Sequence, residues 1–190
     1  MSSAIPKNHM DVLWHDYTTT DEKKVPITEA DLIEKSSIVG RCGLMLLSCG
    51  TGAWRVRSSM NTLSQELGIT CTADIGLMSI NYTCFDGTQC FTQALCLTNT
   101  GVNTSKLNRL EKFVQDFAEN EKHMTGEQLH SRLDEIEQIH GLYSPIALGL
   151  ASALACGAFT FLLGGGPIEM LFAFCGAGIG NFIRCKLTKH

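Results

Sequence analysis

The chain has 190 residues, of which 44% are hydrophobic and 18% are charged, and its net charge is −4. A mildly acidic chain without a basic run is poorly suited to bind phosphates, so nucleic acid is excluded as a partner. The charge is uneven, because residues 144–190 hold only Glu169, Arg184, Lys186 and Lys189. We therefore expect a water-soluble domain followed by a membrane segment.

Residues 1–25 are predicted to be a flexible tail, since they carry the polar tract TTTDEKK and no apolar stretch. The missing apolar stretch also argues against a signal peptide, so the following domain is expected in the cytoplasm. There the nine cysteines should stay reduced, and none has zinc-ligand spacing, so no metal and no other cofactor is predicted. The sequence leaves open whether Trp14 and Tyr17 contact the domain or the bilayer.

Residues 26–143 are predicted to form a cytoplasmic α+β domain, with helices packed on a small antiparallel sheet. The first helix opens at a capping-box pattern, Thr28 with Asp31, and is broken by Gly50. A second helix should cover residues 54–67, where apolar side chains recur at helical spacing.

The middle of this domain is predicted to be β-structure. Residues 70–73 read as a short strand, and the runs MSINYTCF and TQCFTQALCLT flank Asp86-Gly87, a strong signal for a hairpin turn. Two helices follow, the first over residues 104–118. The second begins at a capping box of Thr125 with Gln128 and should end at Gly141.

The segment from residue 144 to 168 contains no Asp, Glu, Lys or Arg over 25 residues. A helix needs about 20 apolar residues to cross the bilayer, whereas a buried helix of a soluble core usually has about 10–14. The second apolar run, residues 170–183, is shorter and should be completed by tilt or by snorkelling of Arg184 and Lys186. Residues 144–186 are therefore predicted to form a transmembrane helical hairpin in contact with the lipid bilayer.

Cationic residues follow the second run, and the turn GGGPIE between the runs has none. The positive-inside rule then places both ends of the hairpin in the cytoplasm, as in a multi-pass protein of the cell (inner or plasma) membrane. Small residues recur every four positions, which favours close helix packing in lipid: Gly149, Ala153 and Gly157 on the first helix, Gly176 and Gly180 on the second. The alternative is that small residues are simply common in membrane helices.

Three segments, in order, resemble one known family. LMLLSCGTGAWRVRSSMNTLSQELGI is similar to a family segment LL-x-x-G-A-E-[ST] that continues as R-V-E…M…L…LGI. The hairpin followed by GVN is similar to its G-[IV]-N step, and LDEIEQIHGLYSPIALGLASALACGAFTFLLGGG resembles its entry into the first membrane helix. Over residues 30–186 the set resembles the threonine/serine exporter family, including the larger subunit of its split members. Gly52 and Arg57 stand where that family has acidic residues, and the effect of this difference stays open.

The resemblance implies export of small hydrophilic metabolites, driven by the proton motive force: threonine and serine, or a dicarboxylate such as succinate in split members. Two helices cannot enclose a polar path. The chain is therefore expected to be a subunit or fragment, completed by a smaller all-membrane partner subunit or by missing C-terminal helices, with a homo-oligomer as a further alternative. The competing hypothesis is a membrane-anchored regulatory or scaffold domain without transport of its own.

Five polar residues are candidates for the substrate path, each with a structural alternative. Glu169 is the only carboxylate in the apolar segments, but an acid also suits a helix N-terminus. Asn181 faces either a path or the neighbouring helix. Arg55 and Arg57 bind either a carboxylate or lipid headgroups, or lie on a solvated helix face. Asn103 is also a plausible helix cap.

No enzyme is predicted. The sequence has no G-x-S-x-G motif, and the spacing of His123, His130 and His140 ties none of them to a nucleophile. We therefore assign no catalytic residue.

Overall fold

The computed structural model describes residues 12–18, 25–139 and 143–187. The chain divides into two compact units, residues 1–140 and 141–190, which are described separately. Most of the expected flexible tail lies outside the described residues. Within it, Trp14–Tyr17 forms a short 3₁₀ helix that packs on the rest of the first unit: Trp14 lies against His130, and Tyr17 accepts a hydrogen bond from Gln93.

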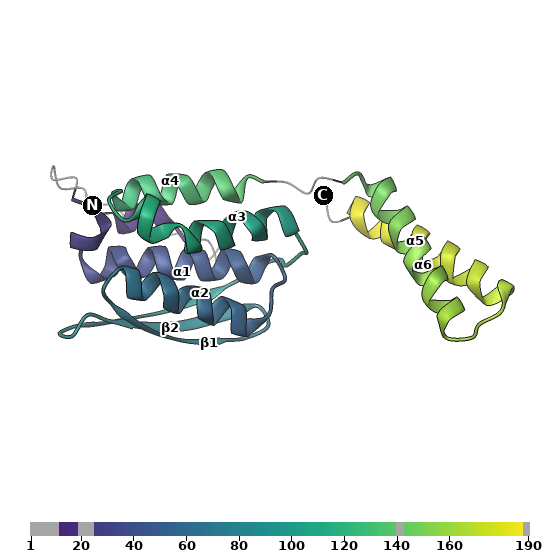
Figure 1. The fold of residues 1–190 in the computed structure, drawn as a ribbon, viewed down its shortest axis with the longest axis horizontal. Coiled ribbons are helices and arrows are strands. Elements are labelled where there is room, and N and C mark those ends of the chain that lie inside the picture. The colour runs from purple at the N-terminus through teal and green to yellow at the C-terminus, as the bar shows by residue number, and fades with distance from the viewer. Residues whose placement is uncertain (1–11, 19–24, 140–142, 188–190) are drawn as a thin grey trace. The chain divides into compact units, whose positions relative to one another are not determined.

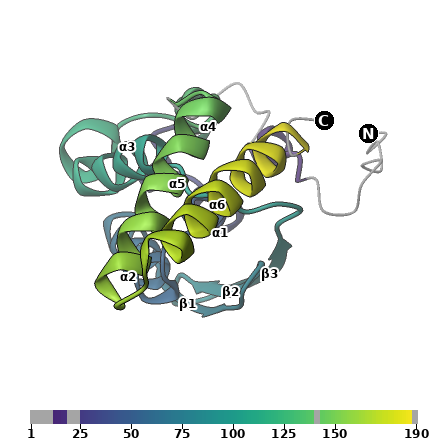
Figure 2. The ribbon, with the colours of Figure 1, turned by 90° about the vertical axis from the view of Figure 1, so that its right-hand side faces the viewer.

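The first unit contains the expected antiparallel sheet. Strands β1 (Thr70–Ile75), β2 (Ser79–Phe85) and β3 (Cys90–Cys96) lie in the order β1-β2-β3, as Figure 2 shows. Gly87 adopts a φ of 102° in the β2–β3 turn, a conformation that strongly favours glycine. The carboxylate of Asp86 fixes the same turn by accepting the backbone N–H groups of the two residues after Gly87. The hairpin predicted from Asp86-Gly87 is therefore confirmed.

Four helices complete the unit: α1 (Leu32–Ser48), α2 (Ala53–Glu66), α3 (Thr104–Gln115) and α4 (Gly126–Glu137). Figure 1 shows α1 and α2 between the sheet and the pair α3 and α4. Because α1 has neighbours on several sides, most of its residues are buried, including polar ones. The predicted α+β fold with a small antiparallel sheet is thus confirmed, and α1 is its central element.

Three helix boundaries differ from the prediction. The cap of α1 is Asp31, which accepts the N–H of Glu34 at 2.7 Å, and Thr28 lies in a separate 3₁₀ turn. The helix expected over residues 104–118 ends at Gln115 and is followed by a π-helix, Phe117–Glu121. The capping box of Thr125 is present as predicted, but α4 ends at Glu137; Gly141 lies outside the described residues.

The second unit consists of α5 (Pro145–Leu162) and α6 (Pro167–Leu187). The two helices lie side by side in both ribbon views (Figures 1 and 2). Helix α6 is longer at both ends than the uncharged run, because Pro167 starts it ahead of Glu169 and its last turn includes Arg184 and Lys186. Its 21 residues correspond to about 32 Å at about 1.5 Å per residue, enough to cross a bilayer without the expected shortfall.

Candidate functional site

The second unit exposes almost all of its apolar surface. Both helices are long and apolar enough to span a membrane, and little of α5 and none of α6 is buried within the structure. Large side chains such as Leu163 and Phe172 are 86% and 73% exposed. A core helix of a soluble protein would be mostly buried. An apolar surface of this extent is stable only against lipid or against further apolar helices.

The contact between α5 and α6 is built from small residues. Gly149, Ala153 and Gly157 are the buried residues of α5. A β-carbon on Gly149 would lie 3.1 Å from the carbonyl oxygen of Gly178, and one on Gly178 would lie 3.0 Å from the β-carbon of Ala153. Helix α6 therefore contributes Gly178 to this approach.

Gly176 and Gly180 are placed differently from the prediction. A β-carbon on either glycine would have no neighbour within 4 Å among the described residues, so both lie on a face of α6 that α5 does not cover. The physical reason is the helical repeat: Gly178 is two residues, about 200°, from each of them around the helix axis. One face of α6 thus packs against α5, and an opposite face carries an open Gly176/Gly180 surface.

Asn181 joins the two apolar helices by a polar contact. Its side-chain nitrogen donates to the carbonyl oxygen of Leu148 on α5 at 2.9 Å, and its side-chain oxygen accepts from Arg184 at 3.0 Å. This geometry favours the packing role over the path role. Glu169 lies in the first turn of α6 and is exposed, a position in which the helix dipole stabilises a carboxylate.

The three remaining candidates lie in the first unit and do not converge. Arg55 is 3.3 Å from Glu111 and stacks over Trp54, whereas Arg57 donates to a carbonyl oxygen of β1 at 3.1 Å. Asn103 caps α3, and its side-chain nitrogen also donates to the carbonyl oxygen of Ile139 at 2.9 Å. Its role in the fold is therefore to cap one helix and tie it to the end of another.

A buried polar cluster, which sequence reasoning missed, joins α1 to α4. Arg41 is only 2% exposed; its guanidinium contacts the carboxylates of Asp134 and Glu137 and donates to the carbonyl oxygen of His130 at 3.0 Å. Its Nε has no partner among the described residues. Removing one member of such a cluster leaves a buried charge uncompensated, which is strongly destabilising.

His130 is held in its neutral form inside this cluster. Its Nδ1 faces the guanidinium of Arg41 at 3.4 Å, and its Nε2 lies 3.0 Å from the hydroxyl of Ser37, which itself donates to a backbone carbonyl. An imidazole with an unprotonated Nδ1 and a proton on Nε2 satisfies both contacts. Burial, followed by the nearby positive charge of Arg41, lowers the pKa of His130 to about 3.

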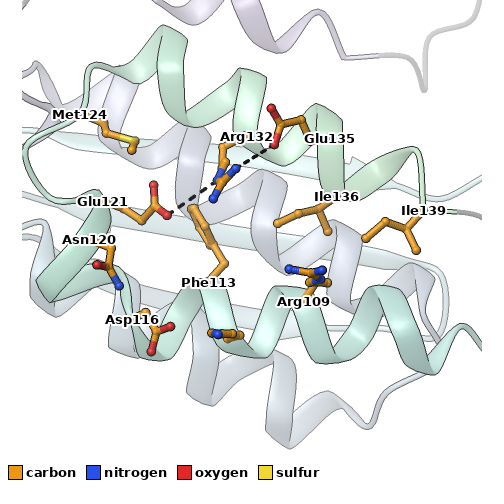
Figure 3. Close-up of a pocket in the computed structure, with 11 residues that line it drawn as sticks. Arg109, Phe113, Asp116, Asn120, Glu121, Met124, Arg132, Glu135, Ile136 and Ile139 are labelled. Carbon is orange, nitrogen blue, oxygen red and sulfur yellow. Dashed lines mark hydrogen bonds and ion pairs between the residues drawn. The ribbon is translucent and has the colours of Figure 1, made fainter.

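A second charged region is a pocket of about 570 Å³ between α3, the π-helix and α4, drawn in Figure 3. Oppositely charged residues line it: Arg109, Lys112 and Arg132 against Asp116, Glu121 and Glu135. The six charged side chains are balanced in sign, so the lining of the pocket as a whole is close to neutral.

Glu121 is the unusual member of this pocket. It is 7% exposed; one carboxylate oxygen lies 3.9 Å from Nε of Arg132, and the other is buried without a partner among the described residues. Arg132 pairs more closely, at 2.9 Å, with the exposed Glu135. The sequence signal for this pocket is that charged residues recur at helical spacing, at Arg109, Lys112 and Asp116. Such a stripe is usually a solvated helix face, so it does not by itself indicate a pocket.

Among the described residues, no group of three His, Cys, Asp or Glu side chains lies close enough to hold a metal ion. The cysteines of the structure are free thiols, and burial raises the pKa of Cys42 to about 12, which makes it a poor nucleophile.

Comparison with known proteins gives one match. The family titled "Putative threonine/serine exporter" matches residues 37–190, a range that begins in α1 and covers most of the first unit and all of the second. No curated protein and no solved structure matches the chain.

Proposed function

We infer from the family to which this chain belongs, the threonine/serine exporters, that it is a subunit of a secondary exporter of small hydrophilic metabolites. The family is a transporter family, which is consistent with the prediction that the chain is not an enzyme. The observation that carries the proposal is the exposed apolar surface of α5 and α6 within the region that matches the family. Threonine and serine are the proposed substrates, with a dicarboxylate such as succinate as the alternative.

We place α5 and α6 in the bilayer as a transmembrane hairpin of a multi-pass protein. Arg184 and Lys186 at the end of α6 support a cytoplasmic position for that end, and the first unit is then cytoplasmic as well. The turn between the helices faces the opposite side. In this arrangement the proton motive force drives export. The two helices of this chain are too few to enclose the substrate path.

Additional helices are therefore part of the proposal. The open Gly176/Gly180 surface of α6 supports it, because small residues let another helix backbone approach closely in lipid. We propose a smaller all-membrane subunit, or further C-terminal helices, as the source of these helices. A second copy of the chain is the alternative source.

Efflux measurements test this function. Cells that lack their own threonine exporters are loaded with a threonine-containing dipeptide, and external threonine is followed with and without the chain and its neighbouring partner gene. The proposal predicts faster efflux with the chain present, and a loss of that gain when a protonophore collapses the proton gradient. Unchanged efflux of threonine, serine and succinate would refute it.

The second candidate function, a membrane-anchored regulatory or scaffold domain, is favoured by the presence of only two candidate spans among the described residues. It predicts that the chain fractionates with membranes but leaves efflux unchanged. A chain that remains monodisperse without detergent would contradict both functions.

A further inference from the structure

The pocket of the first unit has unpaired charges of both signs. Among the described residues, the side chains of Arg109 and Lys112 have no ion-pair partner, and neither has the carboxylate of Asp116. Together with the half-satisfied Glu121, two cations and two anions thus line one cavity without neutralising one another. A pocket of this kind is complementary to a ligand that carries both charges.

The buried oxygen of Glu121 is the strongest sign of a ligand. Buried polar atoms in folded proteins almost always have a hydrogen-bond partner, and a buried oxygen without one is costly. Figure 3 shows Glu121 beside Arg132, with Phe113 next to them in the pocket. A donor that enters the pocket at this point would satisfy the carboxylate, and a cationic donor would do so best.

Arg132 supplies the complementary group next to it. The guanidinium has five N–H donors, of which Nη1 contacts Glu135 and Nε lies 3.9 Å from Glu121. Its remaining N–H groups can donate to a ligand carboxylate that lies beside the carboxylate of Glu121. A ligand whose positive and negative groups are adjacent therefore fits this pair, whereas a purely anionic ligand would face the buried oxygen of Glu121.

We propose that this pocket binds a free α-amino acid, with the ammonium group on Glu121 and the carboxylate on Arg132. The side chain of the amino acid lies against Phe113 and Met124. The volume, about 570 Å³, is within the range of about 300–1,000 Å³ typical of small-molecule sites. All residues that line the site belong to the first unit. The choice of L-threonine and L-serine as ligands rests on the proposed export function.

Binding to the full chain in nanodiscs tests the proposal by calorimetry. L-Threonine or L-serine should bind saturably. L-Threoninamide lacks the carboxylate, and N-acetyl-L-threonine and succinate lack the ammonium group, so each should bind about ten-fold more weakly or worse. Absence of saturable binding of both amino acids would overturn the proposal, and so would equal binding of the analogues.

Two variants locate the site. Glu121→Gln keeps the shape and removes the charge, and Arg132→Gln removes the guanidinium; each should weaken binding of L-threonine about ten-fold or more. Glu119→Gln is the matched control, since Glu119 is an exposed residue of the same π-helix that does not line the pocket, and its binding should equal that of the unmodified chain. Circular dichroism checks that each variant folds. If one of the two pocket variants does not fold, the binding of L-threonine to the other variant tests the assignment. Unchanged binding in a folded Glu121→Gln or Arg132→Gln variant would refute the assignment.

The outcome is separable from the export function. Efflux without amino-acid binding at this pocket would contradict only the pocket proposal, provided that the Glu121→Gln variant exports normally. Binding without efflux would support the pocket and contradict the exporter proposal.

Discussion

Acid should destabilise the first unit through His130, at a pH where carboxylates do not yet titrate. The imidazole is buried between Arg41 and Ser37, with His15 and Asp134 nearby, and its pKa is lowered to about 3. In the unfolded chain its pKa returns to about 6.5. Below pH 6.5 the unfolded state therefore binds a proton that the folded state does not, so the free energy of unfolding falls as the pH falls.

The magnitude follows from the two pKa values. Each pH unit between about 6.5 and 3 removes about 1.4 kcal/mol of stability. Between pH 7.5 and 5.0 the total loss is thus about 2 kcal/mol from this one side chain. Partial burial raises the pKa of Asp134, but hydrogen bonds from Arg41 and His15 outweigh it and lower that pKa, so the loss from Asp134 comes only at more acidic pH.

Tryptophan fluorescence can report this transition directly. Trp14 stacks on His130 with ring centroids 6.2 Å apart, and the other tryptophan of the chain, Trp54, can be replaced by phenylalanine. Urea unfolding of the full chain in detergent, followed at several pH values, gives the free energy of unfolding at each. His130→Gln should lower the stability at pH 7.5 and largely remove its dependence on pH between 7.5 and 5.0. His123→Gln, an exposed control, should keep that dependence.

The reasoning fails if the His130→Gln variant loses stability between pH 7.5 and 5.0 as steeply as the unmodified chain. That result would mean that other groups carry the acid sensitivity. It also fails if the unmodified chain has the same stability at both pH values.

Three further outcomes are expected. Gly40→Ala would place a β-carbon in steric overlap with the hydroxyl of Tyr82 and should cost about 1–3 kcal/mol of stability, measured by urea unfolding. Gly178→Val should separate α5 from α6 and reduce membrane insertion or efflux, whereas Gly176→Val should preserve their contact, as followed by cysteine cross-linking between the helices. Cys42, buried and with its pKa raised to about 12, should react with iodoacetamide only after unfolding, and labelling of the native chain there would contradict its burial.

The role of the candidate residues in a substrate path stays a prediction, although the structure gives three of them a structural partner. The sequence selected polar residues that stand out from their neighbours along the chain, such as Arg57, Asn103 and Asn181. In the structure Asn103 and Asn181 donate to carbonyl oxygens of neighbouring segments, and Arg57 donates to a strand, so each has a structural partner. A polar residue in an unusual position often forms a hydrogen bond with a backbone group that has no backbone partner. The sequence does not show which backbone carbonyl lacks such a partner.

Family membership was read correctly from the order of segments, and it is confirmed by the match over residues 37–190. The capping box at Thr125, the turn at Asp86-Gly87 and the uncharged run of α5 were also predicted from the sequence, because each signal lies within one continuous stretch of the chain.

Tertiary structure alone decided which charges are buried and which are left unpaired. Arg41 and His130 are 89 positions apart, and they meet only because α1 and α4 pack together. Glu121 lies in a polar stretch that reads as solvated, and its oxygen is buried only in the folded unit, where α2 and α3 pack against the π-helix. Local patterns fix elements, but desolvation of a charge depends on the surfaces that fold over it.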